Sequence, residues 1–241
     1  MSDTPSAIVI GASSGIGEAL AREFADNGYE VGLAARRRER LERIGDQLPT
    51  QAYVARMDVT ETADAREGFH ELVDAMDAVD VVVLCAGVGD PNPELEWETE
   101  RQTVDVNVRG FVALATAAMD RFERQGYGHL VGISSVAAHM SVGDVPAYPA
   151  SKAFVSNYCD GLRYRDRSRD ADVHVTTIEP GFVDTDLAGG TFWICSPETA
   201  ASQIHRAIRK RKTKAFVTRR WRLVAGLFEL LPDVVKRQLL S

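Results

Sequence analysis

Tyr148 and Lys152 are the two side chains whose types and spacing best allow proton chemistry. They stand four positions apart, so they share one face of a helix, and Pro149 between them suits a first helical turn. An ammonium group held near a phenol stabilises the phenolate and lowers the tyrosine pKa from its reference value of about 10. The pair is therefore a candidate site of general acid and base catalysis, in which Tyr148 moves the proton.

Two serines and an asparagine are candidates to join this pair. Ser134 and Ser135 follow the strand-like run at residues 129–133, so we expect both hydroxyls at the carboxyl end of a strand, facing one cleft. Asn107 is a polar residue inside the helical stretch at residues 99–124, on a run otherwise built from Val104, Val106, Val108 and Phe111. Its alternative role is structural, as a hydrogen-bonding group at a helix kink.

A glycine-rich turn follows the first apolar run of the chain. Its GxxxGxG spacing allows a tight turn and lets the backbone approach a pyrophosphate, which the free amides and the positive end of the following helix favour. The alternative is that small residues only allow close packing of helix on strand. The candidate cofactor-binding residues in this turn are Gly11, Ser13, Ser14, Gly15, Ile16 and Gly17.

Arginines follow the second apolar run, at residues 31–35. No Asp or Glu stands at its end to bind a ribose 2′-hydroxyl; Arg36, Arg37 and Arg38 stand there instead. Because guanidinium groups match phosphate oxygens, this pattern favours NADP(H) over NAD(H), with Arg36 and Arg37 as the contacts. The alternative is a solvated helix start.

The elements that must position these residues alternate between strand and helix. Most of the strand runs are apolar on both faces, as in buried parallel strands covered by helices. The expected fold is α/β, a doubly wound, Rossmann-like parallel sheet in a single domain with a C-terminal helical extension. The expected strands are residues 7–10, 31–35, 52–57, 79–84, 129–133, 173–178 and, weakly, 215–217.

From about residue 7 to 187 the chain resembles the short-chain dehydrogenase/reductase family of roughly 250 residues. The resemblance rests on motifs that occur in the family's order. They are the turn Gly11 to Gly17, Asp58-Val59, Cys85-Ala86-Gly87, Asn107, the Ser135, Tyr148 and Lys152 spacing, and Pro180-Gly181-Phe182-Val183-Asp184-Thr185. It implies a Rossmann-like fold and hydride transfer between a nicotinamide and a carbonyl or secondary alcohol, without a metal. A catalytically idle dinucleotide-binding sensor or scaffold on the same fold is the alternative.

The resemblance also implies a role for each matching residue. Tyr148 is the expected general acid or base, and Lys152 is expected to bind the nicotinamide ribose and depress the Tyr148 pKa. Ser135 is expected to hold the substrate oxygen, and Asn107 to support a proton-relay water. The other implied cofactor contacts are Asp58 and Val59 at the adenine, Ala86 and Gly87 near the adenosine ribose, Val183 and Thr185 at the carboxamide, and Pro180 and Gly181 in the same motif.

The sequence departs from the family pattern in the expected sheet and at the C-terminal end. Ile10 stands where the family often has Thr, and Leu84-Cys85 where it often has Asn-Asn. The chain also lacks the glycine-rich ending of the tetrameric acyl-carrier-protein reductases, which disfavours a tetramer and leaves a homodimer as the expectation. A short apolar segment between Asp186 and Ser196, where the family covers its substrate, favours an apolar substrate; packing at the core edge is its alternative.

Composition and charge limit which ligands and partners the chain is expected to bind, and where it is expected to be located. The net charge of −7 argues against nucleic-acid binding, and the five histidines show no metal-ligand spacing. Three widely spaced cysteines without a CxxC pair fit a reducing, cytoplasmic location.

The end of the chain differs from the rest. Residues 205–241 carry a net charge of +9, against −16 for residues 1–204, so we expect a catalytic domain at 1–204 and a basic extension at 205–241. An apolar, helix-like segment at residues 221–231 is too short to span a bilayer. It can cover the substrate cleft, form a subunit interface, or lie on an anionic membrane as a peripheral contact.

Overall fold

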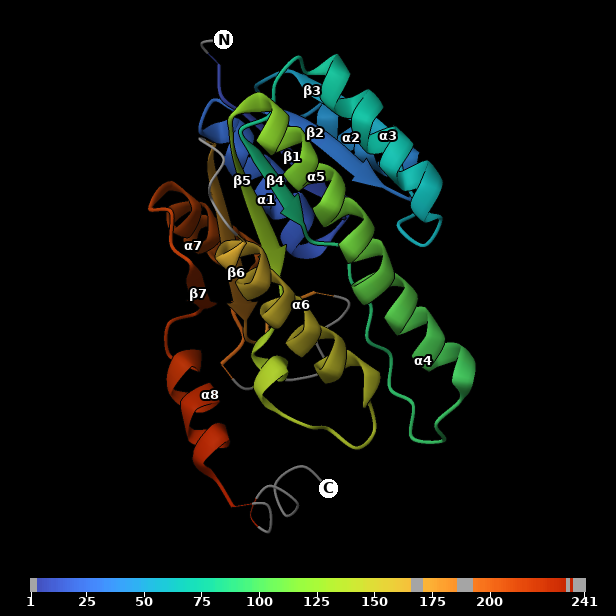
Figure 1. Ribbon diagram of the computed structural model, residues 1–241, viewed down its shortest axis with the longest axis vertical. Coiled ribbons are helices and arrows are strands. Elements are labelled where there is room, and N and C mark those ends of the chain that lie inside the picture. The colour runs from blue at the N-terminus through green and yellow to red at the C-terminus, as the bar shows by residue number, and fades with distance from the viewer. Residues whose placement is uncertain (1–3, 166–170, 186–192, 233–234, 236–241) are drawn as a thin grey trace.

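The computed structural model describes residues 4–165, 171–185, 193–232 and 235 (Figure 1). Within them, seven strands form one sheet in the order β3-β2-β1-β4-β5-β6-β7, and each neighbouring pair runs parallel. The order reverses between β1 and β4, so the doubly wound, Rossmann-like sheet expected from the sequence is confirmed. The strands are β1 (Ser6–Ile10), β2 (Glu30–Ala35), β3 (Ala52–Arg56), β4 (Val81–Leu84), β5 (Tyr127–Ile133), β6 (Asp172–Pro180) and β7 (Lys214–Val217).

Helices cover both faces of the sheet, and each face has its own apolar core (Figure 1). On one face, α1, α2 and α7 bury side chains such as Phe24 and Ile204. On the other, α3, α5 and α6 pack around Phe69 and Phe122. Removal of this apolar surface from water is the main stabilising contribution to the fold. The helices are α1 (Gly15–Asp26), α2 (Arg38–Gly45), α3 (Thr62–Ala75), α5 (Phe111–Gln125), α6 (Ala147–Tyr164) and α7 (Pro197–Arg209).

A long helical run carries a π-helical segment in its middle. It consists of α4 (Trp97–Val104), the π segment η1 (Asp105–Gly110) and α5, which confirms the helical stretch expected at residues 99–124. A π segment inserts an extra residue into the helical turn and is frequent at functional sites. Asn107 lies in η1 and is buried, so the expected irregularity at this residue is present.

The C-terminal part of the chain is divided between the sheet and a peripheral helix. The expected boundary at residues 204 and 205 falls inside α7, and β7 extends the sheet beside β6. The last described helix, α8 (Trp221–Leu230), lies beyond β7 at one end of the molecule (Figure 1). Among the described residues, no helix combines the length and the apolar character needed to cross a bilayer.

A buried carboxylate ties the last two strands to their neighbouring helices. Glu179, near the end of β6, is fully buried. Its Oε1 lies 3.0 Å from Nζ of Lys214 on β7 and accepts a hydrogen bond of 2.9 Å from Ser156 on α6. Its Oε2 lies 2.9 Å from Nε2 of His139, the last residue of the 3₁₀ helix η2 (Val136–His139). Glu179 therefore connects β7, α6 and η2 to the carboxyl end of β6.

We expect Lys214→Met to lower the free energy of unfolding by about 2 kcal/mol, because it removes one partner of a buried charge. The loss should stay below the roughly 3–5 kcal/mol of a fully buried pair, since the Lys214 side chain is 34% exposed. Urea unfolding measures the change. Adding Glu179→Gln to the Lys214 variant should recover part of the loss, and Lys210→Met, at an exposed position, should stay within about 0.5 kcal/mol of the parent. Additive losses in the double variant would contradict the pairing.

Candidate active site

The predicted site residues gather along the carboxyl edge of the sheet. Four strands of the sheet, β1, β4, β5 and β6, end next to one another, and the loops that follow them carry the expected motifs. The helix α6 brings Tyr148 and Lys152 to this edge from the next segment of the chain. The doubly wound topology therefore assembles residues that are far apart in the sequence.

Ser135 lies near Tyr148. The Ser135 side chain is close enough to the Tyr148 phenol to lower its pKa, and Ser135 Oγ accepts a hydrogen bond from the backbone amide of Ala137 at 3.1 Å, which caps η2. The same oxygen lies 3.5 Å from the carbonyl oxygen of Pro180. A serine fixed in this way can bind an oxygen that also meets the phenol. The sequence prediction that Ser135 and Tyr148 act together is consistent with this placement.

Lys152 lies one helical turn after Tyr148, and its side chain is almost completely buried. Nζ lies 5.7 Å from the centroid of the Tyr148 ring and donates a hydrogen bond of 3.1 Å to the carbonyl oxygen of Ile133. Gly87 borders the same space, since a Cβ at this residue would lie 3.1 Å from Nζ. The ammonium group is thus held between the end of β5 and the loop after β4.

The two serines at the end of β5 have different surroundings, although we expected both to face one cleft. Ser134 Oγ donates a hydrogen bond of 2.7 Å to the carbonyl oxygen of Lys152 and lies 2.8 Å from Ser156 Oγ. It therefore fastens α6 to the sheet and leaves Ser135 as the serine beside Tyr148. The spacing could have identified Ser156, because it stands four residues after Lys152 on the same helix face.

Asn107 connects the loop after β4 to α6 through side-chain hydrogen bonds. Its Oδ1 accepts from the amide of Val88 at 2.9 Å, and its Nδ2 donates to the carbonyl oxygen of Val88 at 2.8 Å and to Ser151 Oγ at 2.9 Å. Ser151 in turn donates to the carbonyl oxygen of Tyr148 at 2.7 Å. The side chain of Asn107 thus positions the first turn of α6. A role in supporting a relay water stays a prediction.

Burial shifts the pKa values of both central groups. Burial raises the pKa of Tyr148 above its usual value of 10.0; the hydrogen bond from Ser135 opposes this rise, and nearby Cys85 adds to it. Burial also lowers the pKa of Lys152 from 10.5 to about 8. The expected depression of the Tyr148 pKa by Lys152 is therefore not found. The physical reason is that removal of the phenolate from water outweighs an ammonium group directed toward Ile133.

The glycine turn after β1 has the close backbone approach that a pyrophosphate requires. Gly11 and Gly15 have φ values of +94° and +55°, and a Cβ at Gly17 would collide with the backbone of Gly11. Ser14, which precedes the first residue of α1, has extended backbone and makes no cap with its side chain. Ser13, Ile16 and the three glycines surround the amide end of this helix, where an anion is favoured.

Arg37 is bound to the glycine turn, whereas Arg36 is exposed beside Asp58. Arg37 Nη2 donates to Ser13 Oγ and to Ser14 Oγ, each at 2.9 Å. Burial alone would raise the pKa of Asp58, but hydrogen bonds from Thr60 and the positive charge of Arg36 give a net lowering. Arg36 is therefore close to the end of β3, on the side where the adenine contacts were expected.

The segments after β4 and β6 meet at the glycine turn, and the segment after β3 packs on the π segment. Ala86 lies against Gly11, since a Cβ at Gly11 would be 2.6 Å from the Ala86 amide nitrogen, and a Cβ at Gly15 would be 2.9 Å from Thr185 Cγ2. Val59 is buried against Gly110 of the π segment. The structure thus brings the predicted groups from β1, β3, β4 and β6 to one edge.

The segment after β6 packs against the C-terminal helix. Gly181 lies directly under the indole of Trp221, Phe182 contacts the same indole, and Val183 forms an isolated bridge with Cys195. Of the apolar segment expected over the substrate, Trp193 is described and its ring lies 5.9 Å from that of Trp221. Leu187 and Phe192 lie outside the described residues.

Several residues at the site had no motif that identified them. Gly89 is required because a Cβ there would collide with the Tyr148 ring. Cys85 stood in a motif but had no assigned role, and it lies close enough to affect both central pKa values. Glu179 precedes Pro180 in the sequence, but its contacts with α6 and η2 depend on the folded chain.

These features fit a nicotinamide dinucleotide. The absent side chains at Gly11, Gly15 and Gly17 leave the backbone open to a diphosphate, and two arginines stand beside the turn. The buried Lys152 ammonium and the Tyr148 hydroxyl lie at the other end of the same edge. In the part of the chain that the structure describes, no cluster of three His, Cys, Asp or Glu side chains could hold a metal ion.

We expect Lys152→Met to raise the free energy of unfolding by up to about 3 kcal/mol near pH 7, because it removes a buried charge at similar volume. One pKa unit corresponds to about 1.4 kcal/mol, and burial lowers the pKa of Lys152 from 10.5 to about 8. Between these two pH values the unfolded chain binds more protons than the folded one. The free energy of unfolding of the wild type should therefore rise relative to that of the variant as pH increases from about 8 to 10.5. Urea unfolding at several pH values measures this difference. If the free energies of unfolding of the wild type and the variant change in parallel with pH, burial does not disfavour the charged form of Lys152.

Comparison with known proteins agrees with this geometry. A family model described as short chain dehydrogenase matches residues 5–192. An uncharacterised oxidoreductase of Myxococcus xanthus is 37% identical over 186 residues, which cover 75% of this chain and 73% of the relative. An uncharacterised oxidoreductase of Mycobacterium tuberculosis is 31% identical over 245 residues and covers 96% of this chain and 95% of its own. An NADP-dependent 3-hydroxy acid dehydrogenase of Escherichia coli is 32% identical over 187 residues, with coverages of 76% and 73%.

Solved structures share the same architecture. An alcohol dehydrogenase from Thermococcus sibiricus, complexed with 5-hydroxy-NADP, superposes with a TM-score of 0.78 at 25% identity over 88% of this chain and 95% of its own. A short-chain dehydrogenase/reductase from Burkholderia phymatum in complex with NAD gives 0.85 at 22% identity, with coverages of 93% and 92%. Because the family model spans most of the chain and the doubly wound fold agrees, this chain belongs to the short-chain dehydrogenase/reductase family of oxidoreductases, whose fold binds a nicotinamide dinucleotide.

Proposed function

We propose that the protein is an NADP(H)-dependent oxidoreductase that interconverts an apolar carbonyl compound and the corresponding secondary alcohol. The observation that carries the proposal is the placement of the buried Lys152 ammonium 5.7 Å from the centroid of the Tyr148 ring, with Ser135 close enough to the phenol to lower its pKa. This arrangement provides a proton donor, a group that holds the substrate oxygen, and a nearby positive charge. It stands beside the glycine turn on the same sheet edge.

The proposed chemistry assigns each group one task. A bound nicotinamide supplies or accepts the hydride at its C4 atom. In the reducing direction Tyr148 donates its hydroxyl proton to the substrate oxygen, and its raised pKa keeps it protonated at neutral pH. Ser135 binds the same oxygen, while the Lys152 ammonium compensates the negative charge that develops on the phenol. In the oxidising direction Tyr148 takes the proton from the alcohol.

The preference for NADP(H) is supported by the charges around the glycine turn. No carboxylate stands at the end of β2, Arg37 donates hydrogen bonds to Ser13 and Ser14 of the turn, and Arg36 is exposed near Asp58. The relative from Escherichia coli is named as NADP-dependent, and the structure from Thermococcus sibiricus holds an NADP derivative. The structure from Burkholderia phymatum holds NAD, so the arginines, rather than the fold, carry this proposal.

An apolar substrate is supported by the aromatic side chains next to the catalytic segment. Phe182 and Trp193 are each 38% exposed, and both rings lie within 6 Å of the Trp221 ring. Phe182 follows Pro180 and Gly181, whose backbone lies next to Ser135. Aromatic side chains in this position favour an apolar group beside the reacting carbon.

A homodimer in the cytoplasm completes the proposal. The outward faces of α5 and α6 enclose a groove of about 460 Å³ that Met119, Tyr158 and Leu162 help to line. Apolar side chains in such a groove support burial against a second copy. The mass of the protein in solution tests the dimer. The location rests on the absence of a CxxC pair among the three cysteines and stays a prediction.

We expect Tyr148→Phe to lower kcat by two or more orders of magnitude, about the range that general acid catalysis contributes, while NADPH affinity stays within about threefold. The change removes the proton donor and keeps the ring against Gly89. Turnover with a panel of apolar ketones and cofactor binding by fluorescence measure the two effects. Tyr164→Phe, at the exposed end of α6, is the matched control and should retain wild-type turnover. Wild-type activity in the Tyr148 variant would favour the idle sensor or scaffold.

We expect Arg36→Ala to raise the KM for NADPH by about 10- to 100-fold and the KM for NADH by less than about threefold. Only NADPH offers a 2′-phosphate, and a hydrogen bond to a charged group is worth about 1.5–3 kcal/mol. Arg38→Ala is the control, because Arg38 pairs with Glu42 at 2.8 Å. Arg37→Ala should weaken both cofactors, since Arg37 holds the two serine hydroxyls of the turn. Equal losses for both cofactors in the Arg36 variant would refute the phosphate contact.

A further inference from the structure

The helix α8 has two apolar faces, and only one of them packs on the protein. Trp221 and Ala225 are buried, and this face contacts β7 and η2. Leu223, Leu227 and Leu230 stand at four- and three-residue spacing on the opposite face, with side chains 76%, 58% and 83% exposed. Three large aliphatic side chains in a row on a surface helix form a continuous apolar stripe, which marks an interaction site.

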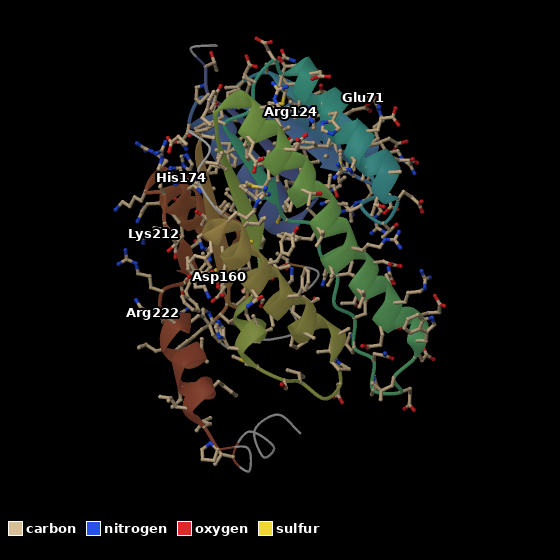
Figure 2. The ribbon with its side chains drawn as sticks, in the orientation of Figure 1. Glu71, Arg124, Asp160, His174, Lys212 and Arg222 are labelled. Atoms are coloured by element: carbon tan, nitrogen blue, oxygen red, sulfur yellow. The ribbon has the colours of Figure 1, made fainter. Side chains whose placement is uncertain are left out.

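Positive charge surrounds the beginning of this helix. Arg219, Arg220 and Arg222 are exposed, and no Asp or Glu occurs between residues 199 and 228. Arg220 is held over the Trp193 ring at 4.9 Å and donates to its carbonyl oxygen at 3.1 Å. Figure 2 places Lys212 and Arg222 along the flank formed by α7, β7 and α8. The apolar stripe therefore adjoins a basic surface.

The uneven charge of the chain would orient the protein on an anionic surface. Residues 205–241 carry +9, whereas residues 1–204 carry −16. An anionic surface attracts the flank of α8 and repels most of the remaining molecule, so it also orients the protein. Leucines beside arginines match the two layers of a bilayer interface, because aliphatic side chains enter the acyl boundary and guanidinium groups bind phosphates.

We propose that α8 docks the protein on an anionic phospholipid bilayer, with Leu223, Leu227 and Leu230 in the interface and Arg219 and Arg222 at the headgroups. A second copy of the chain fits this stripe less well. A two-fold contact in which the two copies of α8 run parallel brings the arginines of one copy close to those of the other, and like charges disfavour that arrangement. The proposal concerns binding only, so it stands or falls independently of the proposed function.

The test is co-sedimentation of the full chain with vesicles of phosphatidylcholine alone or mixed with phosphatidylglycerol. We expect binding to the mixed vesicles at about 0.1 M salt to exceed binding to the neutral ones at least tenfold. It should fall strongly at about 1 M salt, where the Debye length shortens from about 10 Å to about 3 Å. Equal binding to both vesicle types, or no binding to either, would overturn the proposal.

Two variants separate the apolar from the electrostatic contribution. Leu223→Ser combined with Leu227→Ser and Leu230→Ser should abolish vesicle binding. Arg219→Gln combined with Arg222→Gln should lower binding to anionic vesicles about twentyfold and leave the weak neutral binding unchanged. Arg220 is left intact because it holds Trp193. Leu95→Ser, at a 66% exposed site far along the sequence, is the control and should bind as the wild type does.

Mass in solution decides between the bilayer and a second copy. All the substituted positions are exposed, so we expect melting curves and masses equal to those of the wild type. If the leucine variant changes from dimer to monomer and wild-type binding to vesicles is absent, the stripe is a subunit interface and the lipid proposal is wrong. If the variant unfolds, the arginine variant still tests the proposal, because its predicted loss depends on lipid charge alone.

Discussion

The buried ammonium group of Lys152 is the constraint on which the carboxyl edge of the sheet depends. Its side chain is 4% exposed, and an unpaired charge at such a depth is costly. The carbonyl oxygen of Ile133 supplies the hydrogen bond, and Gly87 leaves the room that the ammonium needs. Burial lowers the pKa of Lys152 to about 8, so the group stays charged only near and below that pH. The fold tolerates this cost at a position 5.7 Å from the centroid of the Tyr148 ring.

The residues around Lys152 divide into those that hold α6 on the sheet and those that lie beside the Tyr148 hydroxyl. Ser134 and Ser156 bind α6 to the sheet, and Glu179 holds Ser156 together with η2. Asn107 holds the first turn of α6 through Ser151. These contacts fix both ends of the segment between η2 and α6. They therefore hold Ser135 and Tyr148 near each other. The π segment contributes by turning Asn107 toward the loop after β4.

Local patterns predicted the fold and the central site, because both depend on periodicity and short motifs. All seven strands were expected from apolar runs, and the turn at Gly11 to Gly17 followed the first of them. The contacts between elements were not accessible in the same way. The different surroundings of Ser134 and Ser135 depend on the distance between β5 and α6, and the contacts of Glu179 join β6, β7, α6 and η2. The direction of the Tyr148 pKa shift was also wrong in the sequence prediction, because burial of the phenol depends on packing around Gly89 and Cys85.

The division of the chain into a catalytic part and a tail is electrostatic rather than architectural. The basic region starts inside α7, passes through β7 in the sheet and continues beyond α8, so its first part, residues 205–217, belongs to the Rossmann-like core. At the site, Gly181 has no side chain and the indole of Trp221 rests on its backbone. Since Pro180 precedes Gly181 and its carbonyl oxygen lies 3.5 Å from Ser135 Oγ, one short segment contacts both α8 and Ser135.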